Sequence, residues 1–188
     1  MYALKEMSKA TIIDKRSESS INYERELLSK LKNKFIINMN YAFQDCYNLY
    51  IVLEYLTGGD LRYHLGKNQK GFNEEETKFF IACLVNALEY IHNNKVIHRD
   101  IKPENMVLDS KGYLHLTDFG IAKYAQRENH TETSGTPGYM APEVMAGQNH
   151  NFVVDFFALG VFGYELMMRI VSIFILMLFN ALIDIFKI

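Results

Sequence analysis

The segment VIHRDIKPENMVL, residues 96–108, carries an unusual concentration of side chains that can do chemistry. His, Arg, Asp, Lys, Glu and Asn follow one another closely, between two apolar runs with the composition of strands. Polar residues between buried strands cost free energy unless a site uses them. The segment is therefore either a solvated, charged turn or a catalytic loop, and the elements around it must decide between the two.

The overall composition suits a globular protein and argues against one class of partner. Of the 188 residues, 49% are hydrophobic and 22% are charged, which is enough for one or two units with a core. The formal net charge of −2 gives no indication of nucleic-acid binding, and the basic residues among the first 34 are interspersed with acids. We interpret that region as a solvated face and expect no nucleic-acid partner.

Cysteines, histidines and the chain ends give no metal or targeting signal. Cys46 and Cys83 lie far apart and outside any Cys/His pattern, and the six histidines lack metal-ligand spacing. Because this pattern gives no disulfide framework, we expect a reduced, cytoplasmic setting. The first ten residues have no apolar signal-peptide core. Residues 170–183 form a charge-free apolar run that is short for a membrane span. We expect no span there, with a membrane anchor as the weaker alternative.

The first part of the chain alternates between strand and helix patterns. Residues 2–7, 36–43 and 49–55 have the composition of strands, and the last two are joined by a turn. Between the first strand and the second, residues 20–31 place their leucines at helical spacing. These elements predict a small mixed α+β layer.

Gly58 and Gly59 interrupt this layer as a linker would, and the chain beyond them is mainly helical. Asn73 and Glu76 form a capping-box pattern, which predicts a helix that continues to about residue 92. Two short strands are predicted at 105–109 and 113–118, a polar loop at 121–137, and a second helix from about 153. Together the two parts predict an α+β fold with two lobes.

Separated motifs in a fixed order resemble those of the eukaryotic protein kinases: YALK, GGD, HRDIKPEN, DFG, GTPGYMAPE and D-x-F-x-L-G. An ordered set of this kind is far more specific than any one motif. Within the family, the chain resembles the AGC-type serine/threonine kinases, and the segments FQD and GGDLRYHL are most similar to the YANK group. The resemblance covers residues 2–168 and implies a two-lobed protein-kinase-like fold, in which residues 96–108 are the catalytic loop.

The resemblance implies a role for each polar residue of these motifs in transferring phosphate from ATP. Asp100 would accept the proton of the attacking hydroxyl, and Lys102 would stabilise the transferring phosphate. Asn105 and Asp118 would hold Mg²⁺, because hard cations prefer carboxylate and amide oxygens. Each residue alone could equally well cap a turn, but their mutual spacing favours the catalytic interpretation.

Further residues would bind the nucleotide. Lys5 would contact the α- and β-phosphates and needs an anionic partner to hold it there. Glu24 is the candidate partner, because it lies on the same helix face as Leu28. Glu26 is the rival candidate, but it is out of phase with Leu28. The resemblance assigns the other nucleotide contacts to the gatekeeper Leu53, the hinge residues Glu54 and Leu56, the ribose ligand Asp60, and the adenine-sandwiching residues Ala3, Leu61 and Val107. It also implies an internal hydrophobic column of Leu28, Met39, His98 and Phe119, anchored on Asp155.

The chain departs from the family pattern at both ends and in the activation loop. It begins at the strand of Lys5, without the glycine-rich loop that precedes this strand in the family, so we expect a fold truncated at both ends. We expect a partial N-lobe at residues 1–56, a hinge at 57–60, a partial helical C-lobe at 61–168 and an apolar tail at 169–188. Glu132 stands where the family commonly has a phosphorylated threonine, and its carboxylate would partly imitate a phosphate opposite Arg99.

These features predict a protein serine/threonine kinase that uses ATP and Mg²⁺ and acts on Ser and Thr hydroxyls of protein substrates. The alternative is a truncated kinase-like module that binds ATP or protein partners without catalysis. Intact Lys5, Asp100, Asn105 and Asp118 favour the enzyme.

Three acids predict a preference for basic substrates. In similar AGC-type kinases the positions of Asp60, Glu104 and Glu165 bind arginines upstream of the phosphorylated residue, and carboxylates suit the planar fork of arginine. The opposite interpretation is that Asp60 holds ribose and caps a helix, while Glu165 pairs with a local base.

Overall fold

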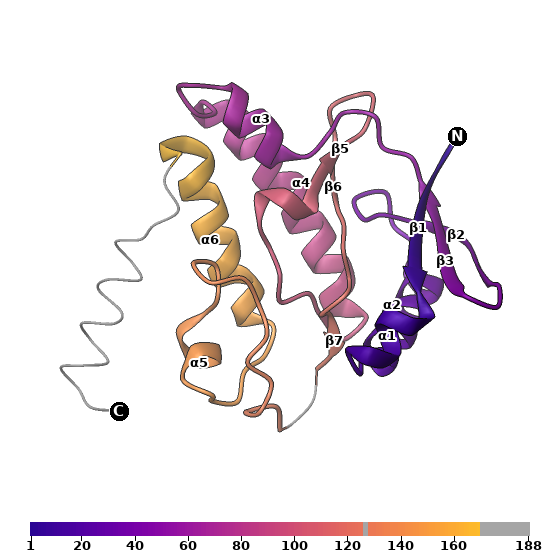
Figure 1. Ribbon diagram of the computed structural model, residues 1–188. Coiled ribbons are helices and arrows are strands. Elements are labelled where there is room, and N and C mark those ends of the chain that lie inside the picture. The colour runs from indigo at the N-terminus through magenta and orange to yellow at the C-terminus, as the bar shows by residue number, and fades with distance from the viewer. Residues whose placement is uncertain (126–127, 170–188) are drawn as a thin grey trace.

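The computed structural model describes residues 1–125 and 128–169, and it sets a small sheet against a larger helical part (Figure 1). The apolar run at 170–183 lies outside the described residues, as does almost all of the predicted tail. Among the residues that the structure does describe, every helix is too short or too polar to cross a membrane.

Three antiparallel strands form the sheet, in the order β1-β3-β2. They are β1 (Tyr2–Ser8), β2 (Met39–Gln44) and β3 (Asn48–Glu54), and each overlaps a predicted strand. Exposed and half-buried residues alternate along β1, so that every second side chain, including Lys5, points to the less exposed face. In the register of the sheet Lys5 lies opposite Ile51 of β3, which fixes where its side chain leaves the strand.

The sequence predicts one of the two helices that accompany the sheet. The predicted helix, α2 (Glu18–Lys30), buries both Glu24 and Leu28. The other, α1 (Lys9–Asp14), is not predicted, because it contains a run of β-branched residues and buries only Ile12. A helix this short depends on its tertiary contacts rather than on intrinsic propensity.

Helices α4 (Glu74–Asn93) and α6 (Val153–Met168) form the body of the second part, together with the shorter α3 (Leu61–Lys67). The capping box predicted for α4 is present. The side chain of Asn73 accepts a hydrogen bond from the backbone N–H of Glu76 at 2.9 Å, and the Glu76 carboxylate accepts one from the backbone N–H of Asn73 at 2.9 Å.

Short strands pair beside these helices and carry the loops of interest. The predicted pair is confirmed as β5 (Met106–Leu108) and β6 (Leu114–Leu116), whereas β4 (Val96–Ile97) pairs with β7 (Lys123–Tyr124). β7 lies inside the predicted polar loop, because two residues are too few to show a strand pattern. The remaining elements are the 3₁₀ turn η1 (Pro103–Asn105) and α5 (Pro142–Met145). The predicted α+β fold with two lobes is confirmed.

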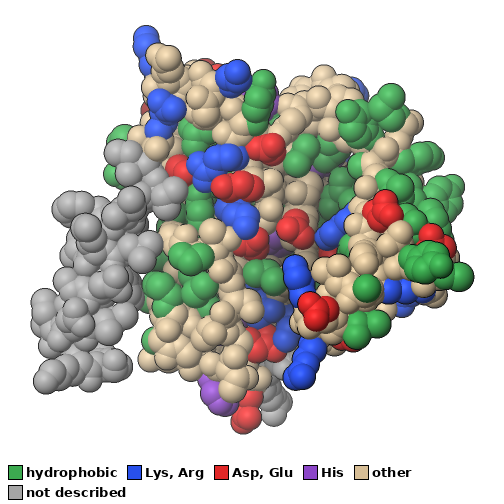
Figure 2. All heavy atoms as spheres, in the orientation of Figure 1, with side chains coloured by type: hydrophobic (Ala, Val, Ile, Leu, Met, Phe, Trp, Pro, Cys, Tyr) green, Lys and Arg blue, Asp and Glu red, His purple; other side chains and the backbone are tan. Residues whose placement is uncertain are grey.

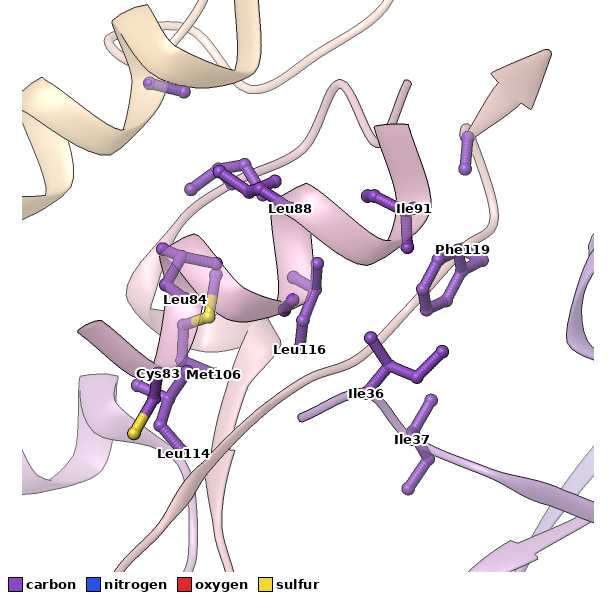
Figure 3. Packing of buried hydrophobic residues seen from close by; sticks show 14 of the residues in the cluster. Ile36, Ile37, Cys83, Leu84, Leu88, Ile91, Met106, Leu114, Leu116 and Phe119 are labelled. Carbon is purple, nitrogen blue, oxygen red and sulfur yellow. The ribbon is translucent and has the colours of Figure 1, made fainter. Parts of the chain in front are cut away.

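One hydrophobic core joins the two parts (Figure 3). Leucines and Ile91 of α4 pack against apolar residues of β5 and β6, and Ile36 and Phe119 complete the cluster. Ile36 belongs to the segment before β2, and the next residue, Ile37, donates a backbone hydrogen bond to Leu116 of β6 at 2.8 Å. The segment that leads into the sheet is therefore fixed to the helical part by both packing and hydrogen bonding.

A buried carboxylate at the start of α6 anchors the chain that follows β4. Asp155 is fully buried and accepts hydrogen bonds from the backbone N–H of His98 at 2.9 Å and of Arg99 at 2.8 Å. Its Oδ2 also lies 2.8 Å from Nε2 of His92 on α4. Arg99 has a φ of 70°, a conformation that is unfavourable for a residue with a side chain. The acceptor oxygens of Asp155 hold the backbone in this conformation.

We predict that Asp155→Ala lowers the free energy of unfolding by about 2–5 kcal/mol, because two buried N–H groups and His92 lose their acceptor. Urea unfolding followed by circular dichroism measures the change. The control is Asp14→Ala, which removes an exposed carboxylate and should change the free energy of unfolding by no more than about 0.5 kcal/mol. Equal losses in the two variants would contradict the proposed anchoring role.

Candidate active site

The residues predicted to be catalytic form one hydrogen-bonded group around Asp100. Its carboxylate accepts from the hydroxyl of Thr136 at 2.5 Å and from the side-chain amide of Asn105 at 2.9 Å, and it forms an ion pair with Lys102 at 2.7 Å. Lys102 also donates to the Thr136 hydroxyl at 2.7 Å. The structure therefore brings Asp100, Lys102 and Asn105 together, and it shows that this carboxylate binds an aliphatic hydroxyl.

Asp100 is charged at neutral pH. Burial by itself raises the pKa of this carboxyl group, but hydrogen bonds from Lys102, Thr136 and Asn105 and the charge of Lys102 hold the pKa below its ordinary value. The neighbouring His98 is fully buried, and the loss of hydration lowers its pKa despite the nearby acids. The group thus presents one ionised acceptor beside one cation.

Lys5 lies between two carboxylates from distant parts of the chain. Its Nζ is 2.6 Å from Oε1 of the buried Glu24 on α2 and 3.8 Å from Oδ1 of Asp118, which follows β6. The ion pair predicted between Lys5 and Glu24 is therefore present. The rival Glu26 instead pairs with Lys30 on the exposed side of α2, at 2.5 Å.

These side chains line a cavity of about 400 Å³ between the sheet and the helical part. Eight of the predicted nucleotide-binding residues line it: Ala3, Lys5, Glu24, Leu53, Glu54, Leu56, Val107 and Asp118. Its walls are largely apolar at the Leu53 and Val107 end and charged at the Lys5 and Asp118 end. A flat apolar group and an anionic group could occupy such a cavity together.

Two predicted nucleotide ligands are not among the residues that line this cavity. Leu61 is fully buried in the main hydrophobic core, and its predicted contact with adenine stays a prediction. Leu61 begins α3, where helix packing turns its side chain inward. Asp60 caps the same helix, since its Oδ1 accepts from the backbone N–H of Tyr63 at 2.8 Å. Its predicted contact with ribose stays a prediction.

Sequence reasoning missed three residues that line the cavity: Ile37, Tyr55 and Thr117. Tyr55 lies between two predicted hinge residues, and Thr117 directly precedes Asp118. Their sequence neighbours were therefore the only indication that these two residues line the cavity. Ile37 could not be assigned in this way, because it reaches the cavity through the bridge that its segment forms to β6.

The connection between the two parts runs along β5. The backbone N–H of Gly58 donates to the carbonyl of Leu108 at 2.8 Å, and the N–H of Leu108 donates to the carbonyl of Gly59 at 2.9 Å. A Cβ atom at position 58 would lie 2.6 Å from Cβ of Leu108, so this close approach requires glycine. The same contact fixes the linker beside β5, whose Val107 lines the cavity.

The predicted hydrophobic column crosses from the sheet side to the catalytic loop. Leu28 and Phe119 are buried, and the rings of Phe119 and the buried His98 pack edge to face with centroids 5.0 Å apart. Met39 is half-buried and packs against the same core. The column ends beside the backbone that Asp155 holds.

Asp118 and Asn105 offer oxygen ligands suited to a hard cation. The Asp118 carboxylate is half exposed at the charged end of the cavity, and Asp118 has a φ of 59°. The side-chain nitrogen of Asn105 donates hydrogen bonds to Asp100, so the amide oxygen of Asn105 is the atom that could bind a cation. Within residues 1–125 and 128–169, no three His, Cys, Asp or Glu side chains gather as a metal site. A cation would thus need further oxygens from a phosphate ligand, which is how Mg²⁺ is usually bound.

Comparison with known proteins agrees with this geometry. A family described as protein kinase domain matches residues 1–174. The chain is 41% identical, over 89% of its length, to a probable serine/threonine-protein kinase of Dictyostelium discoideum. It is 39% identical over 88% of its length to the cAMP-dependent protein kinase catalytic subunit of the same organism, and 39% over 89% to human serine/threonine-protein kinase 32C.

The chain spans only part of these relatives, namely 37%, 25% and 35% of their respective lengths. Human serine/threonine-protein kinase Sgk1 is 40% identical, over 88% of the chain. Identities this similar do not separate one group of kinases from another, so the finer resemblance to the YANK group stays a prediction. Both the family match and the relatives show that the chain belongs to the eukaryotic protein kinases and is of the AGC type.

Proposed function

We propose that the protein containing this chain is a serine/threonine kinase, which transfers the γ-phosphate of ATP to hydroxyl groups of protein substrates. The observation that carries the proposal is the position of Lys5, whose ammonium group lies between Glu24 and Asp118 at the charged end of the cavity. An ammonium group held in this way can bind phosphate oxygens. Relatives named as serine/threonine-protein kinases support the same reaction.

The apolar end of the cavity would bind the adenine ring. Ala3 comes from β1 of the sheet and Val107 from β5 beside the helical part, and both line the cavity together with Leu53 and Leu56. Backbone groups of Glu54 and Leu56 would hydrogen-bond the ring edge, because both residues line the cavity. The adenine would thus exchange water for apolar surface on both faces.

The charged end would position the reacting groups. The ionised Asp100 would accept a hydrogen bond from the substrate hydroxyl, as it does from Thr136, and then its proton. Lys102, 2.7 Å from that carboxylate, would stabilise negative charge on the transferring phosphate. Asn105 and Asp118 would hold Mg²⁺, which would neutralise charge on the phosphates of ATP.

We further propose the division of the chain that the motifs suggest: a partial N-lobe at 1–56, a hinge at 57–60 and a partial helical C-lobe at 61–168. The change from strands to helices between Glu54 and Leu61 supports this division. The two hydrogen bonds between residues 58–59 and Leu108 support a hinge at this position.

Glu132 would anchor the activation loop without phosphorylation. Its carboxylate forms an ion pair with Arg99 of the catalytic loop at 2.6 Å and a second ion pair with Lys123 of β7. Burial by itself raises the pKa of Glu132, but the hydrogen bonds and charges of Lys123 and Arg99 together hold the pKa below its ordinary value. A permanent carboxylate thus occupies the place that the family commonly gives to a phosphate.

Asp100→Asn should slow phosphate transfer to a Ser/Thr peptide by about 10²–10⁴-fold, because the amide cannot accept the hydroxyl proton. Nucleotide affinity should be nearly unchanged, because Asp100 is not among the residues that line the cavity. Radiolabelled phosphate transfer and calorimetric ATP titration measure the two quantities, with the exposed Asp14→Asn as control. The kinase assignment fails if Asp100→Asn transfers phosphate as fast as the control.

Glu132→Gln should lower the free energy of unfolding by about 1–3 kcal/mol at pH 7, because both ion pairs lose their charge. Since the pKa of Glu132 is depressed in the folded protein, its contribution is complete above the ordinary pKa of glutamate, about 4.3, and is lost as the pH falls below that value. The difference between the wild type and Glu132→Gln should therefore shrink in acid.

Urea unfolding at several pH values measures this difference, and Glu128→Gln, an exposed glutamate in the same loop, is the matched control. A difference that stays constant with pH, or one equal to that of the control, would show that the carboxylate does not anchor the loop.

A further inference from the structure

Arg62, in the first turn of α3, binds two acids that are far away in the sequence. Its Nη1 donates to Oε1 of Glu165 on α6 at 2.6 Å, and its Nε donates to Oε1 of Glu104 in η1 at 2.8 Å. Its Nη2 donates to the hydroxyl of Tyr139 at 2.8 Å and lies 3.4 Å from Oε2 of Glu104. Every nitrogen of the guanidinium group is therefore engaged.

The partners of Arg62 form a partly buried, hydrogen-bonded site rather than a chance contact on the surface. The side chain of Glu165 is 1% exposed, and the Tyr139 hydroxyl donates to its second oxygen. Burial and the neighbouring Glu165 raise the pKa of Tyr139, so the phenol stays protonated and remains a donor. A buried carboxylate of this kind needs a cation, and the planar fork of arginine can serve both acids at once.

This site adjoins the groups that would hold the substrate hydroxyl. Glu104 lies two residues after Lys102 in the catalytic loop, and Tyr139 lies three residues after Thr136, which donates to Asp100. In the space-filling view, cationic and anionic side chains alternate down the middle of the face between the sheet and the helical part (Figure 2). A peptide that presents a hydroxyl to Asp100 would therefore pass close to the half-exposed Glu104.

We propose that Arg62 is a specificity-determining residue, which fills a guanidinium-binding site made by Glu104, Glu165 and Tyr139 and so suppresses recognition of substrate arginines. This inference rests on the proposed kinase function. It reverses the expectation that the acids at positions 60, 104 and 165 confer a preference for upstream arginines. Two of these acids already bind an arginine of their own chain, and the third, Asp60, caps α3.

The same geometry predicts how the preference could be restored. Replacing Arg62 would leave Glu104 and Glu165 without their cation, and a substrate arginine could then supply the missing guanidinium group. Arg62→Gln removes the charge but keeps a polar side chain for Tyr139. Because an unpaired buried carboxylate at Glu165 can destabilise the fold, Arg62→Lys serves as the second variant. Its single ammonium group can pair with Glu165 while leaving Glu104 open.

The experiment compares phosphorylation of two peptides that differ only in arginine or norleucine at the upstream positions. For the wild type we expect similar kcat/KM values for both peptides. Arg62→Gln should favour the arginine peptide by about tenfold, mainly through KM, and Arg62→Lys should do so to a smaller extent. Adding Glu104→Gln to Arg62→Gln should abolish the gain, and the exposed Arg25→Gln should leave the ratio as in the wild type.

Two results would overturn the inference: a strong arginine preference in the wild type, or the same peptide ratio in the wild type and both Arg62 variants. A calorimetric titration with the same peptides separates this failure from failure of the proposed kinase function. If no variant phosphorylates either peptide, the kinase function fails. Tighter binding of the arginine peptide by the Arg62 variants would then still support the guanidinium site, and equal binding of both peptides would refute it.

Discussion

The catalytic loop depends on one buried carboxylate. Asp155 accepts hydrogen bonds from the backbone N–H groups of His98 and Arg99. Arg99 adopts a left-handed backbone conformation, which costs a non-glycine residue about 1–3 kcal/mol. The next residue is Asp100, so the backbone that Asp155 holds helps to set the direction of the Asp100 carboxylate. The anchor sits in the hydrophobic core, where hydrogen bonds to a charged acceptor are strong and their loss is expensive.

From this anchor the site is assembled by segments that the core brings together. The column through His98 and Phe119 connects the loop to α2, which positions Glu24 for Lys5. The activation segment contacts the catalytic loop at two places: Glu132 pairs with Arg99, and Thr136 donates a hydrogen bond to Asp100. Since each of these contacts joins residues distant in the sequence, the site and the tertiary fold form together rather than separately.

Much of the fold could be predicted from local signals, whereas the candidate site residues came from the resemblance to the protein kinases. The capping box of α4 and the strands that became β1, β2 and β3 needed only periodicity and turn residues. Helical phase favoured Glu24 over Glu26 as the partner that the resemblance implies for Lys5. The helix α1 could not be predicted in this way, because tertiary contacts override its β-branched sequence. The burial of Leu61 could not be predicted for a related reason: a motif gives the position of a residue, but packing decides which way its side chain points. Arg62 shows the same limit, since its acids were recognised from motifs but their partner depends on how α3 meets α6.

If Asp155 organises the catalytic loop for phosphate transfer, Asp155→Asn should impair catalysis. Asparagine keeps the shape and one acceptor oxygen but loses the charge and one of the two backbone hydrogen bonds. The measurement is kcat for peptide phosphorylation alongside the Kd for ATP, in the wild type and this variant. We expect a fall in kcat of at least about tenfold with little change in Kd, because Asp155 is not among the residues that line the cavity. An unchanged kcat in the folded variant would contradict this role of Asp155.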